Sequence, residues 1–246
     1  MSSKGRIAVV TGGMGGIGTA VCKRLQAEGA TVVALAHTSE EDNIPSWQEA
    51  NPGIEVITGD VASEADAKRM MDSVTEKHGR VDIVVNCAGI TRDTTFKKMT
   101  ADQWEAVINT NLSSIYYVTQ PVWNNMLENG FGRVINIASV NGQRGQFGQA
   151  NYSAAKAGMH GFSMALAYEG ATKGVTANTV SPGYIETAMT AAMRDDVREA
   201  IVSGIPMRRM GTPEEIAAAI AFLAADESTY ITGVNLPVNG GLFISH

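Results

Sequence analysis

The stretch that decides the fold lies near the start of the chain and reads Ile7-Ala8-Val9-Val10-Thr11-Gly12-Gly13-Met14-Gly15-Gly16-Ile17-Gly18. It opens with an apolar run rich in valine, which is typical of a buried strand. A cluster of glycines follows at once, and a helix-like segment begins at residue 16. The stretch therefore predicts a strand, a tight glycine turn and a helix in direct succession.

The glycines of this turn allow two spacings. Gly12, Gly16 and Gly18 fit the pattern G-x-x-x-G-x-G. Gly13, Gly15 and Gly18 fit the pattern G-x-G-x-x-G. Either spacing lets backbone N–H groups approach a pyrophosphate at a helix N-terminus, and no Gly-Lys-Ser/Thr follows that would make a P-loop. We expect a dinucleotide-binding turn, and the alternative is a glycine-rich turn without a ligand.

Short apolar runs alternate with helix-like segments along the rest of the chain. The runs are rich in Val and Ile, which is typical of parallel strands buried on both faces. They occupy 7–10, 31–36, 54–58, 81–85, 133–137, 175–180 and 234–238. The helix-like segments occupy 16–28, 63–78, 101–129, 151–173 and 213–225. Pro121 should kink or restart the third of them. The alternation predicts an α/β fold of Rossmann type, a doubly wound parallel sheet of about seven strands with helices on both faces.

Length and composition predict one domain that spans 1–246, with a less regular, lid-like segment at 182–206. The chain has 246 residues and a net charge of −6. This acidity disfavours nucleic acid and anionic membrane surfaces as partners, because both attract basic proteins. We find no signal peptide, no membrane span and only two cysteines. We therefore expect a cytoplasmic protein, and no metal site is predicted.

The residues after the second strand bear on how the adenosine ribose of a dinucleotide is bound. An acidic residue there would hold the ribose hydroxyls, but Ala36-His37-Thr38-Ser39 stands in its place. No Arg or Lys is present to bind a 2′-phosphate, and Glu40, Glu41 and Asp42 would repel one. The phosphate state of the cofactor therefore stays open.

Two further strand ends are expected at the same edge of the sheet. Asp60-Val61 ends the third strand, and Asn86-Cys87-Ala88-Gly89 ends the fourth. In open α/β sheets, ligands bind at the carboxyl ends of strands. Asp60 is a candidate for contact with an adenine, and a turn or helix-capping role is its alternative. The small residues after the fourth strand suit a close approach of the cofactor.

A second set of polar residues predicts proton chemistry. Ser139 ends the fifth strand, and Tyr152 and Lys156 stand four residues apart on one face of a helix. A nearby ammonium would lower the pKa of Tyr152 from about 10, so that the phenol could give a proton to a carbonyl oxygen. Asn111 lies within a helix-like segment and can bind water or backbone. Each residue alone has a structural alternative, and their order behind a glycine turn is what favours chemistry.

Together these motifs resemble the short-chain dehydrogenase/reductase family over nearly the whole chain. The resemblance implies that Tyr152 is the general acid and that Lys156 lowers its pKa and grips the nicotinamide ribose. It also implies that Ser139 orients the substrate carbonyl and that Asn111 supports a proton-relay water. Cys87 stands where the family usually has a second Asn, and a small buried side chain is its expected role. The matching motifs are 11–18, Asn86-Cys87-Ala88-Gly89, Asn111, Ser139, Tyr152 with Lys156, and Ser181-Pro182-Gly183.

The resemblance implies NADPH or NADH as cofactor. The acidic residues after the second strand indicate that NADH should at least be accepted. The residues expected to bind the cofactor are Gly12, Met14, Gly15, Gly16, Ile17, Gly18, His37, Thr38, Asp60, Val61, Asn86, Ala88, Gly89, Tyr152, Lys156, Pro182, Gly183 and Ile185.

The loop before Tyr152 resembles one branch of the family, the acetoacetyl-CoA reductases of polyhydroxybutyrate synthesis. It reads Ser139-Val140-Asn141-Gly142-Gln143-Arg144-Gly145-Gln146-Phe147-Gly148-Gln149, and the segments 89–93 and 181–185 agree with the resemblance. This implies reduction of acetoacetyl-CoA to (R)-3-hydroxybutanoyl-CoA, for which most members use NADPH. Loop packing is the alternative role for the residues near the substrate path. The side chains expected to bind substrate are Asp93, Ser139, Gln146, Phe147, Gln149, Tyr152 and Tyr184.

Two other functions stay open. A 3-oxoacyl-(acyl-carrier-protein) reductase has the same chemistry but needs a basic surface for its acidic carrier. Arg92, Lys97, Lys98 and Arg133 are the candidates for such a surface. A dinucleotide-binding protein without turnover is the more distant alternative, and the intact set of catalytic residues argues against it.

The resemblance also implies a homotetramer, formed through the two long helices and the last strand. Small residues within 151–173 would allow close packing between subunits, although packing within one subunit explains them almost as well. Pro237 in the last strand fits an edge position.

Overall fold

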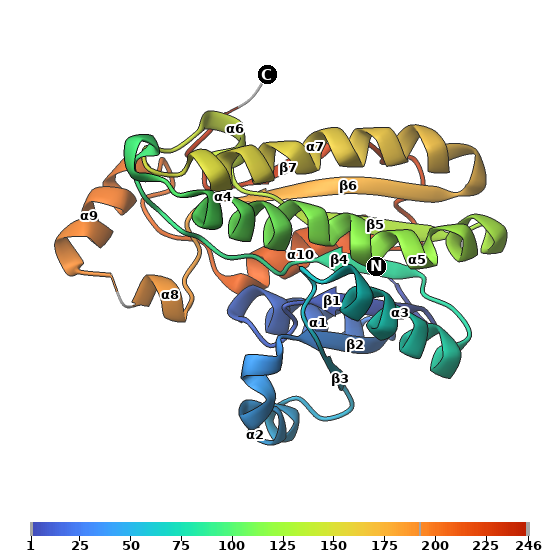
Figure 1. The fold of residues 1–246 in the computed structure, drawn as a ribbon. Coiled ribbons are helices and arrows are strands. Elements are labelled where there is room, and N and C mark those ends of the chain that lie inside the picture. Colours follow the sequence, from blue (N-terminus) through green and yellow to red (C-terminus); the bar gives the residue numbers. More distant parts are fainter. Residues whose placement is uncertain (1, 192, 245–246) are drawn as a thin grey trace.

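The fold is a seven-stranded parallel sheet between two layers of helices (Figure 1). A computed structural model describes residues 2–191 and 193–244. The strand order is β3-β2-β1-β4-β5-β6-β7. The chain adds strands on one side of β1 up to β3 and then on its other side from β4 onward, as in a doubly wound sheet. The predicted fold class is therefore confirmed. The strands are β1 (Ile7–Thr11), β2 (Thr31–Ala36), β3 (Glu55–Thr58), β4 (Ile83–Asn86), β5 (Gly132–Ile137), β6 (Val175–Pro182) and β7 (Asn235–Val238).

Alternate residues of each central strand face opposite helix layers, which explains why the strands are apolar throughout. In β1, Ala8 and Val10 pack with α1 (Gly16–Ala27) and α10 (Pro213–Ala224). Val9 lies in the other core, which contains residues of α3 (Glu64–His78), α5 (Ser114–Asn129) and α7 (Ala150–Gly170). Both cores thus share the one sheet.

The predicted third helix is interrupted, but at a different place from the one expected. The segment 101–129 contains α4 (Ala101–Ile108), a π-helical turn at Asn109–Ser113 and then α5. Helix α5 continues through Pro121 without restarting there. A π-turn contains one residue more than a regular helical turn, and such turns are common at functional positions. Asn111 lies in this π-turn.

Several short helices were not expected from the sequence. A 3-10 turn, Thr38–Asn43, leads into α2 (Ile44–Ala50), and α6 (Val140–Arg144) follows β5. The segment 182–206 contains α8 (Ala188–Ala191) and α9 (Asp195–Gly204), so it has more regular structure than predicted. No helix among the described residues is long and apolar enough to cross a membrane.

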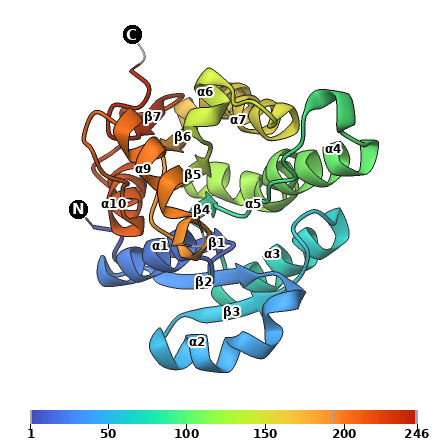
Figure 2. The same ribbon diagram turned by 90° about the vertical axis from the view of Figure 1, so that its left-hand side faces the viewer.

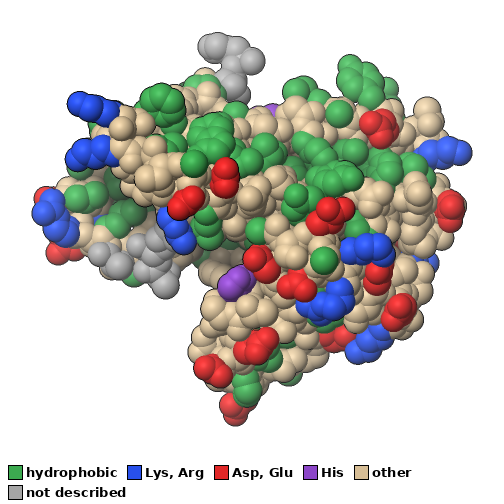
Figure 3. All heavy atoms as spheres, viewed as in Figure 1, with side chains coloured by type: hydrophobic (Ala, Val, Ile, Leu, Met, Phe, Trp, Pro, Cys, Tyr) green, Lys and Arg blue, Asp and Glu red, His purple; other side chains and the backbone are tan. Residues whose placement is uncertain are grey.

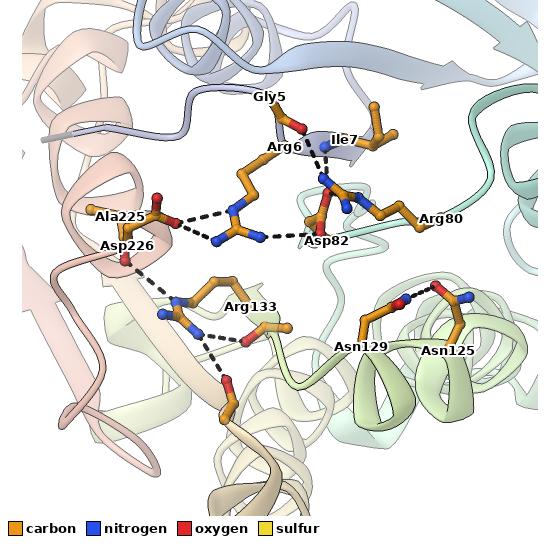
Figure 4. Close-up of polar contacts among 12 residues, drawn as sticks. Gly5, Arg6, Ile7, Arg80, Asp82, Asn125, Asn129, Arg133, Ala225 and Asp226 are labelled. Carbon is orange, nitrogen blue, oxygen red and sulfur yellow. Dashed lines mark hydrogen bonds and ion pairs between the residues drawn. The ribbon is translucent and has the colours of Figure 1, made fainter.

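A partly buried cluster of charged residues, with Asp82 and Arg133 at its centre, ties the amino ends of the strands together (Figure 4). Asp82 accepts hydrogen bonds from Ile7 N (2.8 Å) and Arg80 Nε (3.0 Å). Arg6 pairs with Asp226 at 2.9 Å. Arg133 is 1% exposed, and its guanidinium donates hydrogen bonds to the backbone carbonyls of Gly132 and Gly174. Its burial lowers the pKa of the guanidinium to about 10. Arg133, one of four candidates for a basic docking surface, is therefore not available to such a surface.

The carboxyl ends of the strands form the opposite edge of the sheet. Figure 2 looks onto this edge, where α6, α9 and α4 surround the ends of the central strands. Thr11 pairs with Asn86, and Asn86 pairs with Asn136, so these ends lie level with one another. Loops that leave the central strands are thereby gathered at one place, beside the point where the strand order reverses.

Candidate active site

The glycine turn between β1 and α1 is tightly packed, and this explains both of its spacings. Gly12 has a φ of +59°, and a Cβ there would lie 3.0 Å from the Cα of Ala88. A Cβ on Gly13 would lie 2.6 Å from the Cβ of Ala34. On Gly18 it would lie 2.1 Å from the carbonyl oxygen of Gly12. Glycines of both patterns are thus required for the turn to close against β2 and β4.

The start of α1 is open by contrast. Gly15, the N-cap residue, and Gly16 are exposed, and the first turn of the helix has no acidic residue. A Cβ on Gly15 would meet only the carbonyl oxygen of Gly12, at 3.3 Å. The first N–H groups of a helix have no partner within the helix and carry its positive dipole. This end fits a pyrophosphate, while Met14 and Ile17 are half-buried beside it.

A hydroxyl at the end of β1 fixes the loop after β4. Thr11 Oγ1 accepts hydrogen bonds from the backbone N–H groups of Cys87 and Ala88, both at 3.0 Å. The loop then exposes Gly89, where a Cβ would lie 3.2 Å from Asn111 Oδ1 and 3.5 Å from Lys156 Nζ. Because Gly89 has no side chain, a space remains here that any larger residue would fill. This opening fits the close approach of a cofactor.

Asn111 is buried and holds this loop. Its Oδ1 accepts from Ile90 N at 2.8 Å, and its Nδ2 donates to Ile90 O at 2.9 Å. Asn111 lies in the π-turn, and these two bonds hold its side chain against the loop after β4. Of the two roles expected for Asn111, the structure shows the contact with backbone and identifies Ile90 as its partner.

Ser139 and Tyr152 meet at the end of β5. Ser139 caps α6 by accepting a hydrogen bond from Asn141 N at 3.1 Å. Its hydroxyl also lies near enough to the phenol of Tyr152 to affect its pKa. Burial raises the pKa of Tyr152, the hydroxyl of Ser139 opposes the rise, and Asp93 and Cys87 add to it. The lowering of this pKa expected from an ammonium and a cofactor ribose is not found in the protein alone, where burial, Asp93 and Cys87 outweigh the effect of Ser139.

Lys156 is buried below the ring of Tyr152. Its Nζ lies 5.6 Å from the centroid of that ring and donates a 2.7 Å hydrogen bond to the carbonyl of Ile137. Burial lowers the pKa of Lys156 to about 8, and the neighbouring Cys87 thiol opposes this. Burial also raises the pKa of Cys87 to about 11, which fits the unreactive role expected of it. The four residues Ser139, Tyr152, Lys156 and Asn111 thus come together at one end of the sheet.

The turn after β2 is held by its own side chains. Glu40 Oε2 accepts a hydrogen bond from His37 N at 3.0 Å, and His37 Nδ1 lies 2.8 Å from Ser39 Oγ. His37 and Thr38 are exposed. The carboxylate of Glu40 is therefore fixed beside the end of β2, where a dinucleotide would place its adenosine ribose.

Some expected cofactor residues have structural contacts instead of free side chains. Asp60 Oδ1 accepts from Ala62 N at 2.8 Å, which is the turn role named as its alternative. Val61 is 8% exposed and lies in the core between α3 and the sheet. Asn86 Nδ2 donates to Asn136 Oδ1 at 2.8 Å. Val61 and Asn86 therefore offer mainly backbone atoms to a ligand, whereas the carboxylate of Asp60 is half-buried and can still be reached.

The end of β6 is fixed against β7. Gly183 N donates to Val238 O, and a Cβ on Gly183 would lie 2.9 Å from the Cα of Asn239. Pro182 is the last residue of β6, and Ile185 forms a bridge with Gly211. These contacts hold 182–185 beside the other strand ends.

Two loops pair at the mouth of the site. Gln149 Nε2 donates to Asp93 Oδ2 at 2.8 Å, and Thr94 N donates to Gly148 O at 2.9 Å. Phe147, between them in the second loop, has 86% of its surface exposed. A large exposed aromatic ring beside a polar site is available for a ligand.

Comparison with known proteins identifies the family. A family model described as enoyl-(acyl carrier protein) reductase matches residues 12–243. The acetoacetyl-CoA reductase of Allochromatium vinosum is 67% identical over 243 residues, which cover 97% of this chain and 99% of the relative. This chain belongs to the short-chain dehydrogenase/reductase family. As a short-chain dehydrogenase/reductase, it is an oxidoreductase that binds a nicotinamide dinucleotide.

Other relatives of this short-chain dehydrogenase/reductase differ in the thioester that they are named for. The acetoacetyl-CoA reductase of Cupriavidus necator is 53% identical, over 96% of this chain and 98% of its own. The 3-oxoacyl-(acyl-carrier-protein) reductase of Salmonella typhimurium is 47% identical, over 99% of this chain and 100% of its own. Both kinds of reductase therefore match the chain from end to end.

Sequence reasoning missed three contributors to the site of this short-chain dehydrogenase/reductase. Two of them are established by hydrogen bonds: Thr11 locks the loop after β4, and Ile137 O anchors Lys156. Arg144, the third, is the last residue of α6. A signal existed only for Thr11, because it is the polar residue that ends an apolar strand. Within 2–191 and 193–244, no group of three or more His, Cys, Asp or Glu side chains could hold a metal ion.

Proposed function

We propose that this chain reduces acetoacetyl-CoA to (R)-3-hydroxybutanoyl-CoA. The observation that carries the proposal is the convergence of Ser139, Tyr152 and Lys156 beside the opening at Gly89. The substrate is suggested by the 67% identity to an acetoacetyl-CoA reductase over nearly the full length of both chains. A bound NADH or NADPH supplies the hydride that reaches the 3-keto carbon.

Tyr152 gives the proton in this proposal. Burial raises the pKa of the phenol, so it keeps its proton at neutral pH and can donate to the 3-keto oxygen as negative charge develops there. The hydroxyl of Ser139, which lies near the same phenol, would hydrogen-bond that oxygen. Two hydroxyl groups then orient the carbonyl before the reaction begins.

Lys156 stabilises the phenolate that remains after proton transfer. With a pKa of about 8, it is mostly charged at pH 7, and its Nζ is fixed between Ile137 O and the ring of Tyr152. Asn111 uses one donor and one acceptor site on Ile90, so its amide retains one of each for a relay water. Substitution of Asn111 is thus expected to disturb both the loop at Gly89 and the proton path.

The proposed cofactor residues follow the carboxyl edge of the sheet. The exposed start of α1 at Gly15 and Gly16 would hold the pyrophosphate. Tyr152 and Lys156 would hold the nicotinamide ribose, and His37 with Thr38 would border the adenosine ribose. The remaining contacts, largely from backbone atoms, are proposed for Gly12, Met14, Ile17, Gly18, Asp60, Val61, Asn86, Ala88, Gly89, Pro182, Gly183 and Ile185.

We further propose that NADH is accepted besides NADPH. The carboxylate of Glu40 is bonded to His37 N at the end of β2, and Glu41 and Asp42 follow it. Negative charges here repel a 2′-phosphate. Dissociation constants for both dinucleotides, measured by fluorescence, test this. Binding of NADPH several hundredfold tighter than NADH would contradict it.

A carrier-bound 3-oxoacyl thioester is the second candidate substrate, since a carrier-protein reductase is 47% identical over the whole chain. Arg133 is buried, which leaves Arg92, Lys97 and Lys98 as exposed basic residues near the paired loops. Steady-state kinetics with acetoacetyl-CoA and with an acetoacetyl carrier protein distinguish the two. A much higher kcat/KM for the carrier-bound form would reject the first proposal.

The residues proposed to contact the substrate lie on both paired loops and after β6. Asp93 and Gln149 are bonded to each other, and Phe147 is exposed beside them. Gln146 and Tyr184 line the same cavity. We propose that this chain acts in the cytoplasm in polyhydroxybutyrate synthesis, which a strain lacking it should reveal by lower polymer content.

We propose a homotetramer of single-domain subunits. Hydrophobic side chains gather over α5 and α7 (Figure 3), where Tyr116, Met164 and Tyr168 are exposed. A second exposed apolar set, Phe222 and Tyr230, lies on and after α10. Apolar patches of this kind commonly mark subunit interfaces. Sedimentation velocity tests the assembly, and a monomer at micromolar concentration would contradict it.

A further inference from the structure

A short chain of hydrogen bonds joins α2 to the glycine turn between β1 and α1. The indole Nε1 of Trp47 donates to Thr19 Oγ1 at 3.0 Å, and Thr19 Oγ1 in turn donates to the carbonyl oxygen of Gly13 at 3.3 Å. A hydroxyl has one donor and two acceptor sites, so Thr19 can hold both bonds at once. Trp47 is thereby linked to the turn that is proposed to bind the pyrophosphate.

Gly13 is held through both of its backbone polar groups. Its carbonyl accepts the bond from Thr19, and its N–H donates to Leu35 O at 3.2 Å. Leu35 lies near the end of β2, so the segment 36–47 leaves the glycine turn at Leu35 and returns to it through Trp47. These bonds close a ring around the segment, and a segment that is held at both ends has fewer conformations.

Trp47 also anchors α2 by apolar packing. Helix α2 lies at the lower margin of the molecule in Figure 1, and its residues are exposed or half-buried. The side chain of Trp47 packs against the core that contains α1 and α10. Its backbone carbonyl accepts a 2.6 Å hydrogen bond from Asn51 Nδ2. The indole thus combines an apolar body with one directed polar contact, as buried tryptophans commonly do.

The segment closed by these bonds carries the carboxylates that face the adenosine ribose in the proposed function. Glu40, Glu41 and Asp42 lie in the 3-10 turn Thr38–Asn43, which runs directly into α2 at Ile44. A displacement of α2 would therefore move these carboxylates relative to the glycine turn. The repulsion between a carboxylate and a 2′-phosphate depends on the distance between them. The position of α2 thus bears on which dinucleotide is bound.

We propose that Trp47 is a positioning residue for the choice between NADH and NADPH. Through Thr19 and Gly13, it fixes the acidic turn relative to the place of the pyrophosphate, so the carboxylates stay near the place of a 2′-phosphate. The inference rests on the proposed function, because it takes the adenosine ribose to lie at the end of β2. Trp47 acts in this way without touching the dinucleotide itself.

The variant Trp47→Phe tests the proposal, because it keeps an aromatic ring for packing and removes the N–H. One hydrogen bond corresponds to about a fivefold change in an equilibrium constant. We therefore expect the ratio of the dissociation constants for NADPH and NADH to move toward one by about fivefold. Fluorescence of the reduced nicotinamide measures both constants and does not depend on the tryptophan that is removed. An unchanged ratio would overturn the proposal.

Thr19 provides a second pair of variants. Thr19→Val has a similar shape but no hydroxyl, so it breaks both bonds and should shift the ratio at least as far as Trp47→Phe. Thr19→Ser keeps the hydroxyl and should retain the ratio of the parent. The double variant of Trp47→Phe with Thr19→Val should shift no further than Thr19→Val alone, because both changes act on one chain of bonds. Fully additive shifts would contradict the chain.

The control variant is Trp104→Phe, which changes a tryptophan of α4 that is 39% exposed. Its ratio should equal that of the parent. If Trp47→Phe weakens the binding of both dinucleotides equally, its role is only structural and the inference is overturned.

The properties of the parent separate this inference from the proposed cofactor choice. If the parent binds NADPH several hundredfold tighter than NADH, the proposal that NADH is accepted fails. The ratio should then still move toward one in Trp47→Phe, because the same segment borders the ribose. Equal affinities of the parent for both dinucleotides would leave the acceptance of NADH standing. They would overturn the role of Trp47, because the segment would then select neither.

Discussion

The ammonium of Lys156 donates a 2.7 Å hydrogen bond to the backbone carbonyl of Ile137, the last residue of β5. The bond ties a side chain of α7 to the end of a central strand. It holds the charge 5.6 Å from the ring centroid of Tyr152. The same burial that makes this position rigid also lowers the pKa of the ammonium to about 8. Position and protonation of Lys156 are therefore set together.

The pH dependence of the reaction should reflect this lysine. Its pKa is lowered from 10.5 to about 8, so the charged form is lost as the pH rises through about 8. Burial raises the pKa of Tyr152, which therefore keeps its proton over the same range. We expect kcat/KM for the keto substrate to fall above pH 8. A profile of kcat/KM that stays flat to pH 10 would show that the charge of Lys156 is not needed.

Removal of the phenolic hydroxyl should abolish most of the activity. Tyr152→Phe keeps the ring over Lys156 but has no proton to donate, and general acids of this kind contribute about 10²–10⁴ in rate. We expect kcat to fall by that factor, while the dissociation constant for the dinucleotide changes little. Tyr168→Phe, on the same helix with 90% of its surface exposed, is the matched control. Full activity of Tyr152→Phe would reject the proposed mechanism.

A methyl group at Gly89 should block the cofactor while sparing the fold. Its Cβ would lie 3.2 Å from Asn111 Oδ1 and 3.5 Å from Lys156 Nζ, in the opening beside the proposed nicotinamide ribose. For Gly89→Ala we expect dinucleotide binding to weaken at least about tenfold with little change in melting temperature. Gly161→Ala is the control, since a Cβ there meets nothing within 4 Å. Titration of protein fluorescence measures both, and equal affinities would show that the opening is not used.

The glycines of the first turn should separate into packing and binding positions. A Cβ at Gly18 would lie 2.1 Å from Gly12 O, so Gly18→Ala should lower the free energy of unfolding by about 2 kcal/mol or more. Gly15 is exposed, and Gly15→Ala should cost at most about 1 kcal/mol while weakening dinucleotide binding. Urea unfolding and fluorescence titration measure the two effects. Equal destabilisation by both variants would contradict this division.

The sheet was predictable because its signal is local. Each strand is an apolar run that needs no distant partner to be recognised, and the glycine turn marks the start of α1. The interruption at Asn109–Ser113 was not predictable, because a π-turn depends on where Asn111 must reach rather than on a helix-breaking residue. Pro121 does not mark the interruption, because α5 continues through it.

The residues of the candidate site were predictable from the sequence, but their burial and its effect on their pKa values were not. The spacing of Tyr152 and Lys156 places them on one face of α7, yet only the packing around them determines that burial raises one pKa and lowers the other. Arg133 shows the same limit, because a charged residue in a strand was expected at the surface and lies buried.

The charged cluster at the amino ends of the strands joins segments that are far apart in the sequence, since Arg6 pairs with Asp226 and Asp82 bonds to Ile7 (Figure 4). It lies at the edge of the sheet opposite to the loops that carry the chemistry. Cohesion of the molecule and selection of its ligands are thereby assigned to different ends of the same strands. The carboxyl-end loops can therefore be varied by directed evolution toward other keto substrates while the charged cluster continues to stabilise the fold.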